Sequence, residues 1–142
     1  MWDEIWGEPR WMRAGQIGWT YWAQIRLAKP TLGTIGEWLA LRHVRRLGWS
    51  IVARNWKGRR GEIDLIAYDG PCLVFIEVKA RNSPSPLLPE HSITARKEEK
   101  LEDLAMQFIS GHELIHIPVR IDLVAIEVRN GRRFRLRHYT SA

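Results

Sequence analysis

The chain has 142 residues, 45% of them hydrophobic, which is enough for one domain with a buried core and too few to expect two. Lys and Arg number 22 against 16 Asp and Glu, and the net charge of +6 favours a polyanionic partner such as nucleic acid or an anionic membrane. The single cysteine, Cys72, excludes a disulfide framework and a thiolate zinc site, and it is typical of a reducing compartment.

Residues 1–30 differ in composition from the rest of the chain, because they hold five of the eight tryptophans, namely Trp2, Trp6, Trp11, Trp19 and Trp22. We interpret them as an N-terminal extension of a domain that spans residues 31–142. Residues 17–29 could form a short helix that Pro30 would end. The extension either folds over the domain's own surface or contacts a membrane interface or a protein partner, since tryptophan is enriched at both kinds of site.

The first ten residues lack the basic start and the continuous apolar stretch of a secretory signal. No stretch approaches the roughly 20 apolar residues of a membrane-spanning helix. We therefore expect a cytoplasmic protein with no transmembrane segment.

The apolar periodicity of the rest of the chain predicts the order helix, three strands, helix, two strands. Helices are expected over residues 34–47 and 94–109, and strands over residues 49–55, 62–68, 73–80, 118–128 and 132–138. The first three strands should form a meander. Three prolines indicate a loop over residues 82–91, and Asn130-Gly131 is the strongest hairpin signal in the chain.

Two of the predicted strands carry charged residues inside apolar runs. Asp64 lies in the second strand, and Glu77 and Lys79 lie in the third, where the alternation of side chains puts both on one face. Buried carboxylates are costly without a partner, so these residues indicate a metal ion and an anionic substrate. The alternative is a structural salt-bridge cluster, although such groups on apolar strands are more often functional.

The turn between these two strands predicts their register. If Gly70-Pro71 forms a two-residue loop, Asp69 pairs with Cys72, and Asp64 then lies opposite Glu77. Opposed like charges destabilise a strand pair by a few tenths to about 1 kcal/mol unless a cation lies between them. The predicted register therefore favours a cation between the two carboxylates, whereas a slip of one residue would separate them.

Several short elements combine glycine, apolar and charged residues: Gly33-x-x-Gly36-Glu37, Arg54-Asn55, Gly61-Glu62-Ile63-Asp64-Leu65-Ile66, Phe75-Ile76-Glu77-Val78-Lys79-x-Arg81, Lys97 and Arg120-Ile121-Asp122. Over about residues 31–128, they resemble the bacterial YraN-like family. That family is assigned to the restriction-endonuclease-like, or PD-(D/E)xK, fold and looks related to archaeal Holliday-junction resolvases. The resemblance implies an α/β fold with a mixed central β-sheet flanked by helices. Ile63 departs from the proline in the superfamily's name without moving the carboxylate.

The resemblance also implies a function, that of a metal-dependent endonuclease that hydrolyses phosphodiester bonds in DNA, including branched or junction DNA. Asp64 and Glu77 would be ligands of Mg²⁺ or Mn²⁺, which prefer carboxylate and water oxygens. Lys79 would orient the attacking water or neutralise charge on the phosphate, and without metal it could pair with Glu77. The alternatives are a non-catalytic nucleic-acid-binding module that keeps the fold and a protein that recruits partners through residues 1–30.

Glu37 has two interpretations. Thr34-x-x-Glu37 matches a capping box, in which the glutamate binds a backbone amide at the start of a helix. Glu37 also shares a helix face with Leu41 and Val44, which would point it inward. The family match at Gly36-Glu37 favours a role in catalysis and in the metal site.

Other basic residues are candidates for nucleic-acid binding. Lys97 aligns with the apolar face of the second helix, so it could reach a phosphate or could simply extend to solvent. Arg81 follows the lysine of the third strand. The last strand places Arg133, Arg135 and Arg137 on one face, where they form either a phosphate-binding row or a charged edge that prevents aggregation.

The remaining ionisable residues have less specific patterns. Asp122 lies in an apolar strand and should be a core acid or lie beside the site, while Glu62 shares the face of Asp64. None of the five histidines, His43, His91, His112, His116 and His138, has the spacing of a metal ligand, and we expect solvated or structural roles. By analogy with junction resolvases, which act on two-fold substrates, a homodimer is expected.

Overall fold

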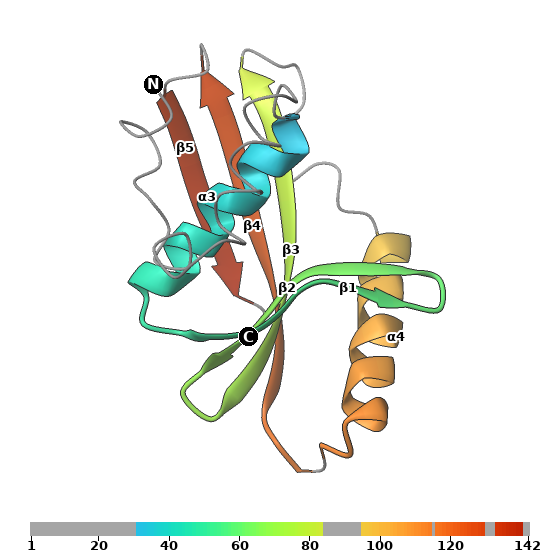
Figure 1. The fold of residues 1–142 in the computed structure, drawn as a ribbon. Helices are drawn as coiled ribbons and strands as arrows, with labels where there is room; N and C mark the ends of the chain where they lie inside the picture. Colours follow the sequence, from blue (N-terminus) through green and yellow to red (C-terminus); the bar gives the residue numbers. More distant parts are fainter. Residues whose placement is uncertain (1–30, 84–94, 115, 130–132, 141–142) are drawn as a thin grey trace, which may run out of the picture.

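A computed structural model describes residues 31–83, 95–114, 116–129 and 133–140 of the chain. Its elements are α3 (Leu32–Arg46), β1 (Ser50–Gly58), β2 (Gly61–Asp69), β3 (Cys72–Ser83), α4 (Ala95–Gly111), β4 (Val119–Arg129) and β5 (Arg133–Thr140) (Figure 1). The order predicted from the sequence is confirmed over these residues. The N-terminal extension and its expected helix, most of the proline-rich loop and the Asn130-Gly131 turn lie outside the described residues.

The five strands form one sheet in the order β1-β2-β3-β4-β5. Neighbouring strands are antiparallel except β3 and β4, which are parallel, because the connection between them crosses over through α4. The sheet is therefore mixed and carries helices, which confirms the predicted fold class.

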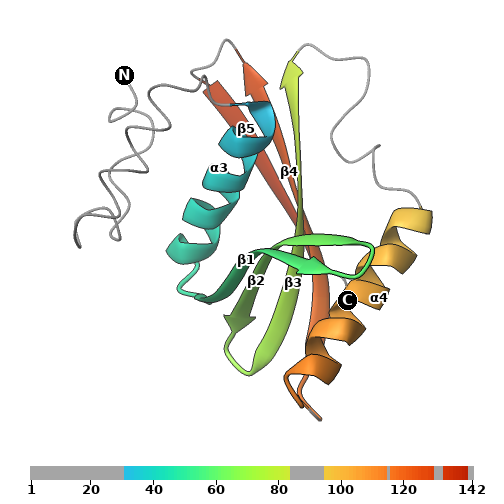
Figure 2. The same cartoon turned by 45° about the vertical axis from the view of Figure 1, so that its right-hand side comes forward.

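The two helices lie on opposite faces of the sheet (Figure 2). Alternate residues of β3 separate the two cores, since Val74 and Ile76 pack with α3, whereas Leu73 and Phe75 pack with α4. This alternation explains why β3 reads as a continuous apolar run. Both faces of the strand are covered.

Strand β3 is longer than its sequence pattern predicts. It continues to Ser83, because residues up to that position pair with β4, ending at Ser83↔Arg129. Asn82 was expected at the start of the loop and instead lies in the strand. Long-range pairing decides this boundary, and no local pattern carries that information.

The start of α3 settles one interpretation of Glu37. The N-cap is Thr31, whose Oγ1 accepts a hydrogen bond of 3.1 Å from the Thr34 backbone N–H. Thr34 is therefore inside the helix, and Glu37 lies in the second turn, too far along to serve in a capping box. That alternative is wrong.

Gly36 allows α3 to approach β3 closely. A Cβ added at Gly36 would lie 2.8 Å from the Cβ of Ala80, which is closer than real Cβ atoms come to their neighbours. The glycine therefore sets the distance between helix and strand at the turn that carries Glu37. None of the described helices is long and apolar enough to cross a membrane.

Candidate functional site

The second and third strands separate at the two carboxylates. The predicted register is confirmed, since Asp69 pairs with Cys72 and the pairing runs to Leu65↔Ile76. The next step would bring Asp64 opposite Glu77, but the backbone pairing stops before it. Instead, the side chain of Asp64 bonds to β3, because its Oδ2 accepts a hydrogen bond of 2.8 Å from the Val78 N–H. Asp64 is thus fixed to β3 beside Glu77.

Glu77 and Lys79 form an ion pair on the face of β3 that also carries Leu73 and Phe75. Lys79 Nζ lies 3.0 Å from Glu77 Oε1, and the two side chains are 28% and 15% exposed. The same-face arrangement predicted from strand alternation brings them together. The positive charge of Lys79 partly offsets the negative charge of Glu77 on this strand.

Glu37 reaches the site from α3 and is held by a residue of β1. The Asn55 side chain donates a hydrogen bond to its carboxylate, and Arg54 lies near it while stacking over the Trp38 ring at 5.4 Å. Asn55 falls between the pairs Arg54↔Leu65 and Trp56↔Ile63, which is the position opposite Asp64. Its backbone is left-handed, with φ of 49°. Asn55 therefore contacts Glu37 from a position opposite Asp64 in the strand pairing.

The electrostatics of the site oppose ionisation of Asp64 and Glu37. Burial, and after it the negative charge of Glu77, raises the pKa of Asp64 to about 7, although the Val78 hydrogen bond and Lys79 act in the other direction. Burial also raises the pKa of Glu37, against the hydrogen bond from Asn55. The charges of Glu77 and Glu37 therefore act against ionisation of Asp64, and Lys79 and Arg54 offset only part of the negative charge of the site.

The donor set fits a hard divalent cation held by few protein ligands. Among the residues that the structure describes, no group of three or more His, Cys, Asp or Glu side chains is arranged to hold a metal ion. Asp64 and Glu77 are nonetheless the carboxylates that such a cation prefers, and Mg²⁺ is usually bound through one or two carboxylates and several waters. Asp64 and Glu77 are the residues that would hold such a cation.

The residues predicted to bind nucleic acid have different environments. Arg81 on β3, Lys97 on α4, and Arg133 and Arg135 on β5 are exposed. Arg137 is half-buried, and its guanidinium donates a hydrogen bond of 2.7 Å to Glu127 Oε1. The predicted row of three arginines therefore has two exposed members and one that is paired with a buried acid.

A pocket of about 520 Å³ adjoins Glu77 between α4, β4 and β5. Its walls combine apolar side chains with Glu98 and Glu102 of α4, and Tyr139 lies on the β5 side. Glu77 therefore lies next to a space large enough for a small molecule or part of a polymer. No sequence pattern identified this pocket, because its walls come from four separate segments.

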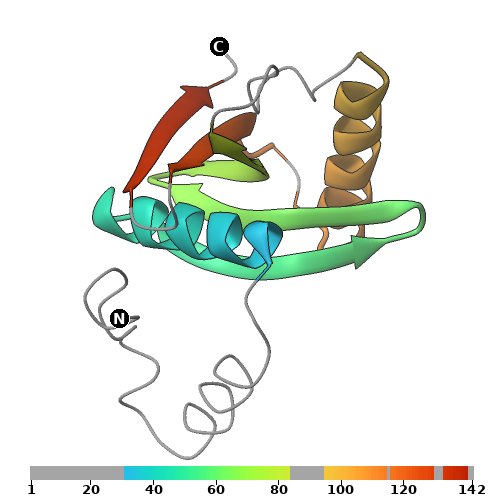
Figure 3. The same ribbon diagram turned by 90° about the horizontal axis from the view of Figure 1, so that it is seen from above.

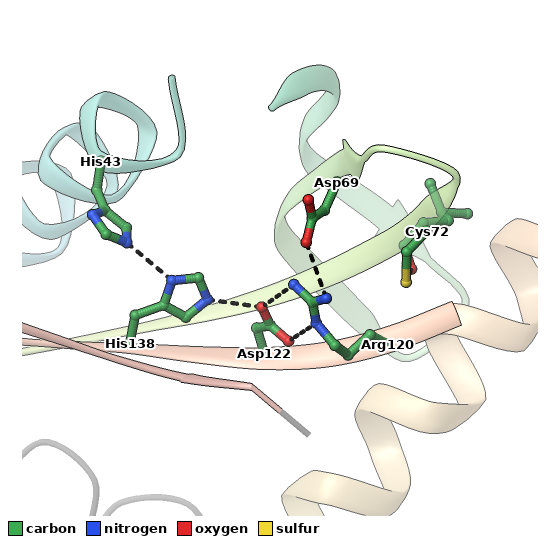
Figure 4. A network of polar contacts seen from close by, with 7 residues as sticks. His43, Asp69, Cys72, Arg120, Asp122 and His138 are labelled. Atoms are coloured by element: carbon green, nitrogen blue, oxygen red, sulfur yellow. Dashed lines mark hydrogen bonds and ion pairs between the residues drawn. The ribbon is translucent and has the colours of Figure 1, made fainter. Parts of the chain in front are cut away.

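A chain of polar contacts crosses the α3 side of the sheet (Figure 4). His138 Nε2 lies 2.7 Å from Asp122 Oδ2, and His138 Nδ1 lies 2.9 Å from His43 Nε2. Arg120 donates two hydrogen bonds to Asp122, of 2.8 and 3.0 Å, and a third of 3.1 Å to Asp69. Asp122 is 1% exposed, so its predicted place in the core is confirmed.

This polar network supplies hydrogen-bond partners to the buried carboxylate of Asp122. Burial alone would raise the pKa of Asp122, but hydrogen bonds from His138 and Arg120 lower it. Burial, followed by the charge of His138, lowers the pKa of His43. His43 and His138 were expected to be solvated or structural, and both prove to be structural links between α3, β5 and β4.

Sequence reasoning gave no role to Asn55, although it noted Arg54-Asn55 among the family elements. The available signal was chemical: asparagine is disfavoured inside strands and tolerates left-handed backbone. An asparagine in an otherwise strand-like segment indicates an interruption of the ladder. Nothing local showed that the interruption would face Glu37.

A five-stranded mixed sheet with one helix on each face is consistent with an α/β fold of the restriction-endonuclease-like class. The chain belongs to the family described as uncharacterised protein family UPF0102, whose model matches residues 36–126. This confirms the resemblance to the YraN-like family.

Relatives from distant bacteria match most of the chain. A UPF0102 protein of Chloroflexus aurantiacus is 41% identical over 105 residues, which cover 73% of this chain and 85% of the relative. A UPF0102 protein of Renibacterium salmoninarum is 43% identical over 110 residues, 78% of this chain and 93% of the relative. One from Pelotomaculum thermopropionicum is 39% identical over 116 residues, 81% of this chain and 97% of the relative.

Proposed function

We propose that the protein is a metal-dependent endonuclease that hydrolyses phosphodiester bonds in DNA. The observation that carries the proposal is the point where β2 leaves β3, at which Asp64 is fixed by the Val78 N–H beside the Glu77–Lys79 pair. Ionisable groups with opposed charges and a raised pKa are common at catalytic sites. A purely structural cluster would be expected to neutralise its acids more completely.

Each residue has a role that its position suits. Asp64 and Glu77 would hold Mg²⁺ or Mn²⁺, which when bound polarises a phosphoryl oxygen and lowers the pKa of a water ligand. Lys79, now 3.0 Å from Glu77, would turn to the phosphate and neutralise charge that develops there. Glu37, oriented by Asn55, would accept a hydrogen bond from the attacking water.

The proposed substrate is branched or junction DNA. The family resemblance to junction resolvases supports it, as does the net charge of +6. A homodimer would match the two-fold symmetry of such a substrate. Residues 1–30 would contact a protein partner, and both that contact and a cytoplasmic location remain predictions.

A cleavage panel tests the proposal. Purified protein should cut at least one of branched, flapped, single-stranded and linear DNA with Mn²⁺ or Mg²⁺. Asp64→Ala and Glu77→Ala should each lower the rate at least 100-fold, whereas Asp103→Ala, an exposed acid on α4, should leave it unchanged. Equal cleavage by wild type and Glu77→Ala would assign the activity to a contaminant and reject the proposal.

A second candidate is a nucleic-acid-binding module that keeps the fold without the chemistry. Two observations favour it: Glu77 is already paired with Lys79, and the described residues contain no three-residue metal group. Calorimetric titration with Mn²⁺ separates the two functions. Binding that disappears in Asp64→Ala and Glu77→Ala supports the nuclease, and DNA binding without any Mn²⁺ binding supports the module.

A further inference from the structure

The first two strands extend beyond the rest of the sheet as a two-stranded ribbon. Pairing of β2 with β3 ends at Leu65↔Ile76, but pairing of β1 with β2 continues to Gly58↔Gly61. Figure 3 shows the tip of this ribbon passing over α4. The tip, residues 57–60, is therefore a separate projection next to the candidate site.

The ribbon tip is seated firmly on α4. A Cβ at Gly58 would lie 2.5 Å from Leu104 Cδ2, and a Cβ at Gly61 would lie 2.6 Å from Lys100 Cε. The Arg59 N–H donates a hydrogen bond of 2.9 Å to Gln107 Oε1. Two glycines and one side-chain hydrogen bond thus let the backbone rest directly on the helix, which fixes the direction of the tip.

The seated tip presents positive charge. Lys57, Arg59 and Arg60 are exposed, and the two arginines form no ion pair with another described residue. Glu62 lies opposite Lys57 and offsets part of its charge, while Lys100 of α4 adds a further cation beside Gly61. A protein gains no stability by holding like charges together, so the arrangement fits a polyanionic partner.

The distance from the tip to the candidate site suits a nucleic-acid backbone. Arg60 and Asp64 are separated by four steps of an extended strand, which is about 13 Å at ~3.3 Å per residue. Along B-DNA this distance corresponds to about four base pairs at ~3.4 Å each. A duplex that reaches Asp64 and runs along the ribbon would therefore bring a phosphate near the tip about four base pairs away.

We propose that the basic tip of the β1–β2 ribbon, formed by Arg59 and Arg60 with Lys57 and Lys100, binds the sugar–phosphate backbone of duplex DNA. The contact positions a duplex arm and reads no sequence, because guanidinium and ammonium groups at a backbone recognise phosphate. The choice of DNA rests on the proposed function. The binding contact itself does not need metal or catalysis.

Fluorescence anisotropy with a labelled DNA duplex, in EDTA, tests the tip directly. Arg59→Ala with Arg60→Ala should weaken binding at least tenfold at low salt, and the slope of log K against log salt should fall by about 2. The matched control, Arg46→Ala with Arg129→Ala, removes two exposed arginines from α3 and β4 and should change affinity less than threefold. Arg59→Lys with Arg60→Lys should retain most of the binding, which excludes misfolding as the cause.

Equal losses in the tip variant and the control would overturn the proposal, because net charge alone would then explain the binding. Tighter binding of the tip to anionic vesicles or duplex RNA than to duplex DNA would also overturn it. The Glu77→Ala protein serves as a separate arm. If it binds DNA through the tip as wild type does, but wild type cleaves no DNA in the cleavage panel, the tip proposal stands while the nuclease proposal fails.

Discussion

Asp64 is a carboxylic acid whose charged form is opposed by its surroundings. Burial and Glu77 raise its pKa to about 7 in the folded protein, from 3.8 in an exposed side chain. Between these values the folded state binds more protons than the unfolded state, so the contribution of Asp64 to stability falls as pH rises from about 4 to about 7. Well above pH 7, Asp64 is charged in both states and its full unfavourable contribution to folding stability is present.

The variant Asp64→Asn isolates this cost. Asparagine still offers an oxygen to the Val78 N–H but carries no charge. Without divalent cations the variant should be more stable than wild type by up to about 4 kcal/mol at pH 8, and the difference should disappear near pH 4. Urea unfolding in EDTA at both pH values measures it.

Addition of Mn²⁺ supplies the control for the Asp64 prediction. The ion should raise the unfolding midpoint of wild type at pH 8 and leave that of Asp64→Asn nearly unchanged. A wild type that is the more stable of the two at pH 8 in EDTA would show that Asp64 is stabilised as an anion and that the site needs no cation.

At the scale of the element, the position of α3 depends on one residue without a side chain. Gly36 lies against Ala80, and the adjacent Glu37 reaches Asn55 because the helix comes this close to β3. A larger residue must move the helix or the strand. Either movement would change the position of Glu37 relative to Asn55.

Gly36→Ala should therefore lower the free energy of unfolding by about 1–2 kcal/mol, since overpacking outweighs the better helix propensity of alanine. Gly33→Ala is the matched control on the same helix, where a new Cβ has only an ordinary contact of 3.8 Å with Thr31 Oγ1. That variant should be neutral or slightly stabilising. Urea unfolding compares the two, and the second change Ala80→Gly should restore the Gly36→Ala protein.

Equal stability of Gly36→Ala and Gly33→Ala would show that helix and strand adjust without cost. In that outcome Gly36 does not set the position of Glu37. A loss of stability that Ala80→Gly fails to restore would place the strain elsewhere.

At the scale of the whole molecule, the polar network joins α3 to three strands. His43 of α3 contacts His138 of β5, which contacts Asp122 of β4, and Arg120 completes the chain to Asp69 of β2. The Trp49 ring packs edge-on against His138 at 5.5 Å. Protonation of His43 would place a further positive charge against His138.

The variant His43→Gln tests that link through pH. The pKa of His43 is lowered in the folded state, so its contribution to stability is present above its usual value of 6.5 and is lost as pH falls. Wild type should lose more stability than His43→Gln between pH 7.5 and pH 5. Over this range the contribution of Asp64 to stability changes with pH in the opposite direction. Unfolding should therefore be measured with Asp64→Asn present in both proteins, which removes that contribution. Parallel pH curves would contradict the prediction.

Features that depend on local patterns were predictable from the sequence. The element order follows from apolar periodicity, the β2–β3 register from the Gly70-Pro71 turn, and the meeting of Glu77 with Lys79 from strand alternation. These signals act over a few residues. The candidate carboxylates could therefore be identified from the sequence alone.

Features that depend on distant partners were not predictable. The pairing of Arg137 with Glu127 and the extension of β3 to Ser83 both require the register of strands that meet only in the folded sheet. The hydrogen bond from Asn55 to Glu37 likewise joins residues of different elements, β1 and α3. A single sequence does not contain these distances.

The interruptions of β1 also affect how the molecule meets its own copies. This strand is an edge of the sheet, and its ladder shifts register between Ile51 and Ala53 and then carries the left-handed Asn55. An edge broken twice offers a foreign strand no long, regular row of backbone donors and acceptors, which is how natural sheets avoid edge-to-edge aggregation. The asparagine that orients Glu37 thus also makes β1 a poor template for intermolecular strand addition.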